Sequence, residues 1–337
     1  MKSNLMSRLS PALGLIIGLL ALAIAARFLG SMSLISTLTE CLILMVMVVG
    51  MSIFIGNSGV VSFGHIGFAM IGAYASAWQT CCSGMRQVFM PGLPDWLLSA
   101  NVSVFWAAVI GGLLAAAFGL VVGVAIMRLS GVAASIALLS LLFVVKTIYE
   151  NWQSVTAGQS SLVGLPLYVN LWVALLVVSV SILVAQLYRD SGFGLKLRAT
   201  REDEPAARAA GVRVLPQRLI AFVLSAFVVG IGGILYGHFL GTLAVNMFWL
   251  DLTFVTLAML VVGGLRSLTG AVVGTLAVTI VREILRALEQ GIEIRGHNFA
   301  APQGIQEIGL SLVLLAILIY RPQGLVGDRE LGRPKVT

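Results

Sequence analysis

Two short segments carry residue types that could form a nucleophile and its base. Residues 56–59 read GNSG and fit a GxSG pattern around Ser58, and His238 stands three residues before Gly241. A serine hydroxyl becomes a nucleophile when a neighbouring histidine takes its proton. If the fold brought Ser58 and His238 together, the chemistry would be peptide-bond hydrolysis.

This pair of motifs resembles the rhomboid family of intramembrane serine proteases. The chain holds 37 glycines, so short Gly-Ser patterns arise readily by chance, and it is long enough for four spans beyond the rhomboid core. Labelling of Ser58 by a serine-reactive probe would support this alternative.

Ion coupling is the second kind of chemistry to weigh. A transporter driven by protons or sodium needs charged groups inside the membrane, and the candidates that we single out are Glu40, Lys146 and Glu150. Lys146 and Glu150 stand four residues apart and can pair on one helix face. An ion-coupled secondary transporter therefore stays as a second alternative.

Nucleotide and metal sites are not expected in this chain. None of its four lysines lies in a GxxxxGK[ST] loop, the device that holds nucleotide phosphates. The three cysteines, Cys41, Cys81 and Cys82, lack metal-ligand spacing. We expect no cofactor and no metal.

The elements that position these residues are membrane helices. Hydrophobic residues make up 59% of the 337 residues and charged residues 10%, and the mean hydropathy is +1.02. A helix spans the bilayer with roughly 20 apolar residues, and continuous apolar runs exclude a barrel. We predict one all-α polytopic domain over 1–337, with about ten spans at 11–30, 34–55, 59–80, 101–127, 130–149, 170–188, 218–241, 251–265, 268–288 and 304–320.

Charge sets the expected orientation. The longest charged loop, 189–217, is rich in arginine, and basic residues also flank the first and last predicted spans. Because cytoplasmic loops carry excess Lys and Arg, we place this loop and both termini in the cytoplasm. The net charge of +7 is explained by topology, so no nucleic-acid partner is expected.

The loop 189–217 also predicts a short helix, from Thr200 to Ala210. Three acidic residues would occupy its first turn, where the helix dipole favours negative charge, and Gly211 suits its C-terminus. Its alanines would form a small-residue face for a soluble partner. These residues are Glu202, Asp203 and Glu204 in the first turn, and Ala206, Ala207, Ala209 and Ala210 on the face.

Residues 204–211, EPAARAAG, resemble the EAA loop of ABC importer permeases, with Ala206, Ala207 and Gly211 in register and Glu204 displaced by one position. Five blocks resemble the LivM-type permeases for branched-chain amino acids: GNSGVVSFGHIGFAMIGAY, LRATREDEPAARAAGVRV, AFVLSAFVVGIGGILYGHFLG, VVGGLRSLTGAVVGT and YRPQGLVG. Arg266, Ala271 and residues 242–254 depart from the family pattern.

The resemblance implies a fold, partners and a location. The chain would pair with a homologous LivH-type permease subunit in the inner membrane, with two cytoplasmic ATPases that bind ATP and a periplasmic binding protein. Coupling to the ATPases would fall on Glu202, Glu204, Ala206, Ala207 and Gly211. The substrate would be a branched-chain or related amino acid, with urea or a short amide as the alternative.

Glycines at four-residue spacing predict close helix packing, because small residues on one face let helices approach. They form three sets, which are Gly119 and Gly123; Gly270 and Gly274; and Gly233, Gly237 and Gly241. Generic packing explains these faces, and a sliding contact during transport is the sharper alternative.

Residues 56–67 combine many glycines with polar side chains, which predicts a broken or re-entrant start to the third span. Such backbone is tolerated in a membrane where protein buries it or where it lines a cavity. We therefore place a translocation path beside Ser62, Gly64, His65, Gly67 and Tyr74 as a hypothesis. A histidine bonded to a neighbouring helix is the equally supported structural explanation.

Overall fold

The computed structural model describes residues 5–81, 86–98, 102–290, 292–294, 297–299, 302, 304–327 and 330–331. Every predicted span coincides with a helix, so the all-α prediction is confirmed. The long helices are α1 (Leu5–Leu29), α2 (Met32–Ser58), α3 (His65–Thr80), α6 (Val104–Ile126), α7 (Gly131–Asn151), α9 (Leu171–Asp190), α12 (Val214–Leu240), α13 (Leu250–Gly263), α14 (Leu268–Gln290) and α15 (Ile305–Tyr320).

Short elements fill the connections between these helices. The helical ones are α4 (Arg86–Phe89), α5 (Asp95–Leu98), α8 (Gln153–Thr156), α10 (Gly192–Glu202), α11 (Glu204–Ala209) and the 3-10 turn η1 (Val245–Phe248). The strands form two antiparallel pairs, β1 (Leu162–Val163) with β2 (Thr242–Leu243), and β3 (Ile292–Ile294) with β4 (His297–Phe299).

Within the described residues, eight helices are long and apolar enough to cross a membrane. The third and tenth predicted spans correspond to α3 and α15, which have only 16 residues each. The third span does not begin at 59 as predicted, because α2 continues to Ser58 and residues 59–64 are not helical. The predicted break at the start of this span is therefore confirmed.

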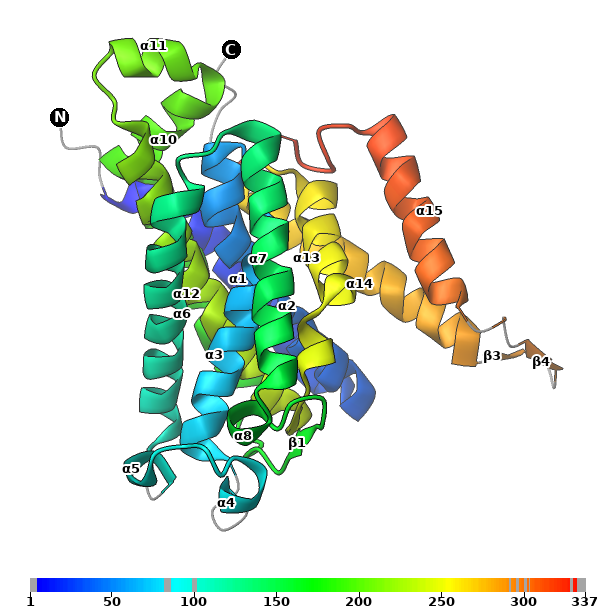
Figure 1. The fold of residues 1–337 in the computed structure, drawn as a ribbon. Helices are drawn as coiled ribbons and strands as arrows, with labels where there is room; N and C mark the ends of the chain where they lie inside the picture. The colour runs from blue at the N-terminus through cyan, green and yellow to red at the C-terminus, as the bar shows by residue number, and fades with distance from the viewer. Residues whose placement is uncertain are drawn as a thin grey trace.

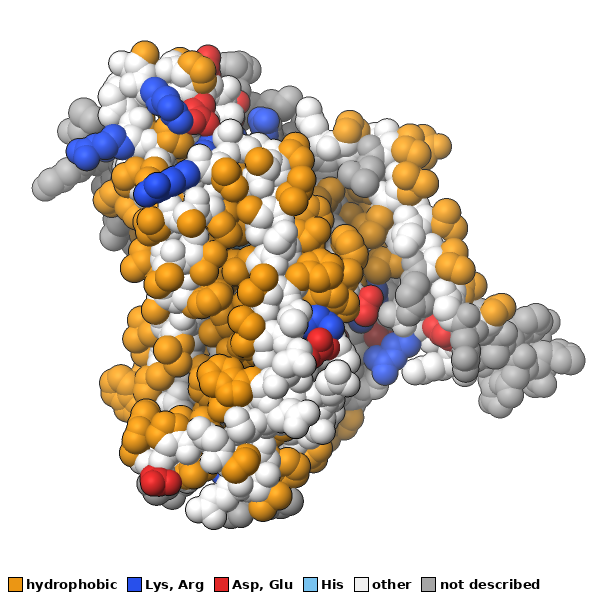
Figure 2. All heavy atoms as spheres, viewed as in Figure 1, with side chains coloured by type: hydrophobic (Ala, Val, Ile, Leu, Met, Phe, Trp, Pro, Cys, Tyr) orange, Lys and Arg blue, Asp and Glu red, His pale blue; other side chains and the backbone are white. Residues whose placement is uncertain are grey.

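The α2 helix forms the centre of the bundle. In its most apolar stretch 89% of the residues are buried, and α12, α9 and α14 pack around it (Figure 1). Large apolar side chains such as Leu113, Val121 and Ile136 are instead exposed on α6 and α7. Figure 2 shows hydrophobic side chains covering this outer surface, as expected of a surface that meets lipid.

Glycines hold α12 against α3 and α6. A side chain at Gly233 would collide with the backbone of Ala69, and one at Gly230 would collide with Ala115. Gly119 and Gly123 on α6 similarly face Ala226 and Phe222 of α12. The helices pack closely at these four glycines, because their neighbours leave little or no room for a Cβ atom.

One member of the predicted glycine face has a different role. Gly241 lies outside α12 as its C-cap, with a φ of 69°, and its N–H bonds to the carbonyl of Gly237. A positive φ is costly for residues other than glycine. Gly241 therefore ends the helix and does not extend the packing face, while Gly237 lies against Leu243.

The blocks VVGGLRSLTGAVVGT and YRPQGLVG meet in space. A side chain at Gly263 would collide with the carbonyl of Gly270, so α13 and α14 approach through bare backbone. The chain after α15 then binds the end of α13: the N–H groups of Leu325 and Val326 donate to the carbonyls of Val262 and Gly263. This contact explains why both blocks need glycine.

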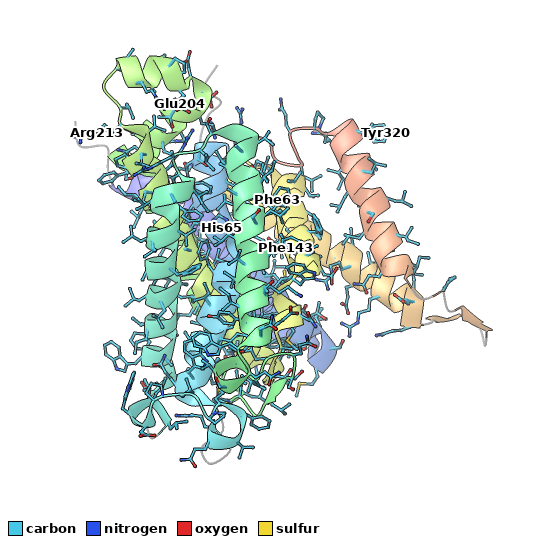
Figure 3. The ribbon with its side chains drawn as sticks, in the orientation of Figure 1. Phe63, His65, Phe143, Glu204, Arg213 and Tyr320 are labelled. Atoms are coloured by element: carbon cyan, nitrogen blue, oxygen red, sulfur yellow. The ribbon has the colours of Figure 1, made fainter. Side chains whose placement is uncertain are left out.

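The loop 189–217 and the end of α15 lie at the same end of the molecule. Figure 3 places Glu204, Arg213 and Tyr320 there, and Figure 1 shows α14 and α15 leaning away from the upright helices. The loop 189–217 and the described end of the chain after α15 thus share one end of the molecule, while the basic residues 2, 329, 333 and 335 lie outside the described residues.

Candidate functional site

The loop 189–217 folds into two short helices instead of the single predicted one. The first, α10, ends at Glu202, and α11 runs from Glu204 to Ala209. Asp203 separates them, because its backbone is extended and its carboxylate accepts a hydrogen bond from the N–H of Ala206 at 2.9 Å. An aspartate bonded in this way is an N-cap, which starts a new helix.

The predicted end of this helix is confirmed. Gly211 has a φ of 83°, and its N–H donates to the carbonyl of Arg208 at 2.9 Å. The N–H of Val212 reaches back to the carbonyl of Ala207 at 3.0 Å. This pair of bonds satisfies carbonyls that the end of a helix leaves without partners, and it favours glycine.

The alanine face is smaller than predicted. Ala206, Ala209 and Ala210 are exposed, but Ala207 is buried within this chain and only 6% exposed. Ala207 therefore packs the short helix onto its own protein and is not available to a partner. The small residues that stay exposed here are Ala206, Ala209, Ala210 and Gly211, and their docking role stays a prediction.

Glu204 fixes α11 to the start of α12. Its two carboxylate oxygens pair separately, Oε2 with Arg218 at 2.8 Å and Oε1 with Arg208 at 2.6 Å. Partial burial would raise the pKa of Glu204, but the hydrogen bonds and charges of Arg208 and Arg218 outweigh burial and lower it. Arg218 is buried and also donates to the carbonyl of Leu129 at 3.3 Å.

Arg201 fixes α10 to the end of α2. Its Nη1 donates to the carbonyl of Gly56 at 2.5 Å, and its side chain occupies the space where a Cβ atom of Gly59 would lie. Arg201 also pairs with Glu202, and this hydrogen bond lowers the pKa of Glu202. The helix C-terminus is the end at which a cation is stabilising.

Arg266, a departure from the family pattern, also faces this loop. It lies in the turn between α13 and α14, half exposed, with its Nη1 3.9 Å from the Glu202 carboxylate. The Arg266 charge thus brings the turn between α13 and α14 close to α10, in addition to the contact of α10 with α2. A cleft of about 450 Å³ lies between these elements, lined by Ser58, Arg201, Glu204, Arg218 and Arg266 among others.

A further anchor comes from residues that sequence reasoning did not single out. Arg189, at the end of α9, pairs with Glu330 beyond α15, and both side chains are largely buried. The Glu330 carboxylate also accepts hydrogen bonds from the N–H of Leu268 at 2.7 Å and from the Thr269 hydroxyl at 2.9 Å. Glu330 thereby caps α14 and ties it to the loop 189–217.

The residues predicted to line a translocation path are enclosed within this one chain. Ser62, His65 and Tyr74 are fully buried, and His65 Nδ1 lies 2.5 Å from the hydroxyl of Ser62. Gly64 faces the backbone of Leu138 on α7, and Gly67 faces Leu142.

Aromatic rings surround the His65 imidazole. Phe54, Phe68 and Phe222 each have their ring centres within 5.8 Å of it. This arrangement supports the structural explanation, with Ser62 rather than a helix backbone as the partner. A role of these residues in translocation stays a prediction.

The geometry does not support the protease alternative. Ser58 lines the cleft beside Arg218, near the start of α12, whereas His238 lies near the other end of that helix, about 30 Å away at 1.5 Å per residue. His238 Nδ1 donates to the carbonyl of Pro166 at 3.1 Å, and Nε2 accepts from the Ser76 hydroxyl at 2.9 Å. Both ring nitrogens are used structurally.

The intramembrane pair predicted on α7 is confirmed. Lys146 and Glu150 are 2.5 Å apart, and the Lys146 ammonium also lies 4.5 Å from the centre of the Trp249 ring. A pair that satisfies itself in this way leaves little for an ion to bind. The ion-coupled alternative gains no support from it.

The fold and the loop 189–217 define a polytopic permease. The family model described as "Branched-chain amino acid transport system / permease component" matches residues 33–320, so the chain belongs to this family of ABC importer permeases. Members of this class work with ATPase and substrate-binding subunits.

Curated relatives agree with this assignment. The high-affinity branched-chain amino acid transport system permease protein LivM of Escherichia coli is 25% identical over 95% of this chain and 76% of its own length. The corresponding protein of Salmonella typhimurium is 24% identical over the same shares. A probable LivM permease of Methanocaldococcus jannaschii is 26% identical over 50% of this chain and 49% of its own length. No solved structure matches the chain.

Proposed function

We propose that this chain is one of the two membrane subunits of an importer for branched-chain or related amino acids in the inner membrane. Energy would come from ATP hydrolysis by partner subunits at the cytoplasmic end. A periplasmic binding protein would deliver the substrate at the other end. The second membrane subunit would be a homologue of this chain, of the LivH type.

The observation that carries the proposal is the way in which α10 and α11 are attached. Arg201 bonds to the end of α2, Glu204 to the start of α12, and Arg189 to the Glu330 cap of α14. A force on the exposed alanines of α11 would therefore reach three membrane helices through charged bonds. A loose connector between two spans would need none of these bonds.

The substrate is tested with the complete transporter. The chain is co-expressed with its partner permease, both ATPases and the binding protein, and reconstituted in proteoliposomes that contain ATP. We expect accumulation of leucine, isoleucine or valine that stops when the partner ATPase carries a substitution of its phosphate-binding lysine. Accumulation of urea alone would favour the amide alternative, and ATP-independent uptake would refute the proposal.

The docking surface is tested by Ala210→Arg, because Ala210 is the exposed C-cap residue of α11. We expect the variant to insert and fold normally but to lose co-purification of the ATPases and uptake. Ala133→Arg is the matched control, since Ala133 is also exposed but lies near the start of α7. Normal uptake by the Ala210 variant would contradict the docking role.

A further inference from the structure

One face of α14 carries charge at a distance from the loop 189–217. Arg282, Glu283 and Arg286 follow one another at helical spacing, and Thr37 and Glu40 of α2 and Gln306 of α15 line the same cavity. Figure 2 shows acidic and basic side chains gathered between the body of the bundle and the leaning helices. We call this cavity and the hollow beside it the outer recess.

The outer recess lies at membrane depth. The α14 helix begins at Leu268, which Glu330 links to Arg189 at the start of the loop 189–217. Arg282 is fourteen residues further, which places it about 21 Å along the helix at 1.5 Å per residue. The hydrocarbon core is about 30 Å thick. Because α14 leans away from the upright helices, its depth is less than this distance, so Arg282 and its neighbours fall inside the hydrocarbon core.

The charges of the outer recess are not matched as pairs. Among the residues that the structure describes, Glu40, Arg282, Glu283 and Arg286 form no ion pair within 4.0 Å, in contrast to Lys146 and Glu150 on α7. Charged side chains within the membrane are costly, and in general they either pair or mark a substrate pathway. Pairing between described residues does not account for these four.

Only the larger part of the outer recess, the hollow beside Arg286, has room for a small molecule. The cavity beside Glu40 and Arg282 measures only about 30 Å³, enough for a water molecule. It adjoins a hollow of about 450 Å³ lined by Arg286, Glu289, Gln290 and Gln306, and the two share Arg286 and Gln306. Small-molecule sites fall within the range of 300–1,000 Å³.

The chemistry of the lining selects a ligand with both charges. The guanidinium groups of Arg282 and Arg286 suit a carboxylate, and the carboxylates of Glu40 and Glu283 suit an ammonium group. A simple anion or a simple cation would leave one set without a partner. A zwitterion satisfies both sets, and a free amino acid is the smallest common one.

We propose that the outer recess binds the charged head group of a zwitterionic amino acid as it passes from the binding protein into the membrane. This inference rests on the proposed function, because it assumes that the cargo is an amino acid. It assigns a passage site to residues of α2 and α14 and not to the enclosed pair Ser62 and His65.

The test uses the complete transporter in proteoliposomes with its binding protein outside and ATP inside. We compare Glu40→Gln and Arg282→Gln with Arg27→Gln, which removes an exposed arginine from the end of α1. Initial uptake is measured together with the ATPase activity that the loaded binding protein stimulates. Arg282→Lys is included because it keeps the positive charge.

We expect each glutamine variant to lose about ten-fold or more in uptake, the effect of losing one hydrogen bond to a charged group. Stimulated ATPase activity should be unchanged, Arg27→Gln should transport normally, and Arg282→Lys should retain part of the uptake. Wild-type uptake in the same vesicles tests the proposed function separately.

Two results would overturn the inference while leaving the proposed function intact. The first is normal uptake by both glutamine variants in vesicles where the wild type transports an amino acid. The second is loss of assembly with the ATPases in both Arg282→Gln and Arg282→Lys, which would assign Arg282 to folding. If the wild type accumulates no amino acid, the proposed function itself fails.

Discussion

The loop 189–217 and the outer recess treat charge in opposite ways. At the end that carries the loop 189–217, Arg189, Arg201, Glu204 and Arg218 all have partners on other elements or on the backbone of another helix. In the outer recess, the four charged residues form no ion pair within the described part of the chain. The charges of the loop 189–217 connect helices to one another, whereas we propose that the charges of the outer recess bind a ligand.

This difference indicates how the work of transport is divided. A bonded network moves as one body, since breaking a buried pair by removing one partner costs several kcal/mol. Unpaired charge gives no such rigidity, but it can exchange water for a ligand. Four predictions test whether stability depends on charge in one of these two regions only.

The largest effect is expected for Glu330→Ala. It leaves Arg189 buried without its partner and removes the hydrogen bonds to Leu268 and Thr269, so we expect a loss of about 3–5 kcal/mol. The measurement is the thermal unfolding midpoint of the purified protein in detergent. Glu202→Gln is the control, because Glu202 is a half-exposed carboxylate whose pairs are worth less than about 1 kcal/mol.

The next effect separates the two arginines that share one carboxylate. Glu204→Gln should cost about 2 kcal/mol, because it weakens the bond to the buried Arg218. Arg208→Ala removes the exposed partner and should cost less than about 1 kcal/mol. A double-mutant cycle with Arg218→Met measures the coupling. Equal losses of unfolding free energy from Arg208→Ala and Glu204→Gln would contradict the claim that Arg218 is the more important partner of Glu204.

A smaller effect follows from pH. The pKa values of Glu202 and Glu204 are lowered in the folded protein, so their contribution to stability is complete above the unfolded value of about 4.3. It is lost as the pH falls through the folded values. We expect the thermal unfolding midpoint to decrease as the pH is lowered below about 4.3. In the double variant Glu202→Gln/Glu204→Gln this decrease should be smaller. An unchanged slope would indicate that other groups control it.

The smallest effect is expected in the outer recess. Arg282→Gln breaks no ion pair among the described residues, so we expect a change in unfolding free energy within about 0.5 kcal/mol. The same unfolding measurement, made beside Glu330→Ala, provides the comparison. A loss as large as that of Glu330→Ala would mean that both regions carry structural charge, and the contrast between them would disappear.

Much of the fold can be predicted from the sequence, because the signals are local. Ten apolar runs mark ten helices, and Gly211 marks the end of α11, since φ-positive backbone favours glycine. The pair of Lys146 and Glu150 follows from helical spacing alone. The segments that resemble LivM-type permeases then identify the loop 189–217 as similar to the EAA loop of ABC importer permeases.

The remaining features depend on contacts between distant segments. Nothing near Arg189 in the sequence points to Glu330, and the burial of Ala207 depends on how α11 rests on the chain. Residues 62 and 65 looked suited to a polar path, but the three phenylalanines that enclose His65 come from α2, α3 and α12. The outer recess likewise joins residues of α2, α14 and α15, so spacing alone does not indicate it.

The Glu330 carboxylate also has a consequence for the order in which the protein is made. It caps the first turn of α14 from a position 62 residues later in the chain. While the ribosome is still producing α15, the first N–H groups of α14 and the Arg189 guanidinium both lack the Glu330 carboxylate. The contacts of Glu330 with Arg189, Leu268 and Thr269 can therefore form only after residue 330 has been synthesised. A nascent chain that stalls before this residue would have its membrane helices but not these contacts.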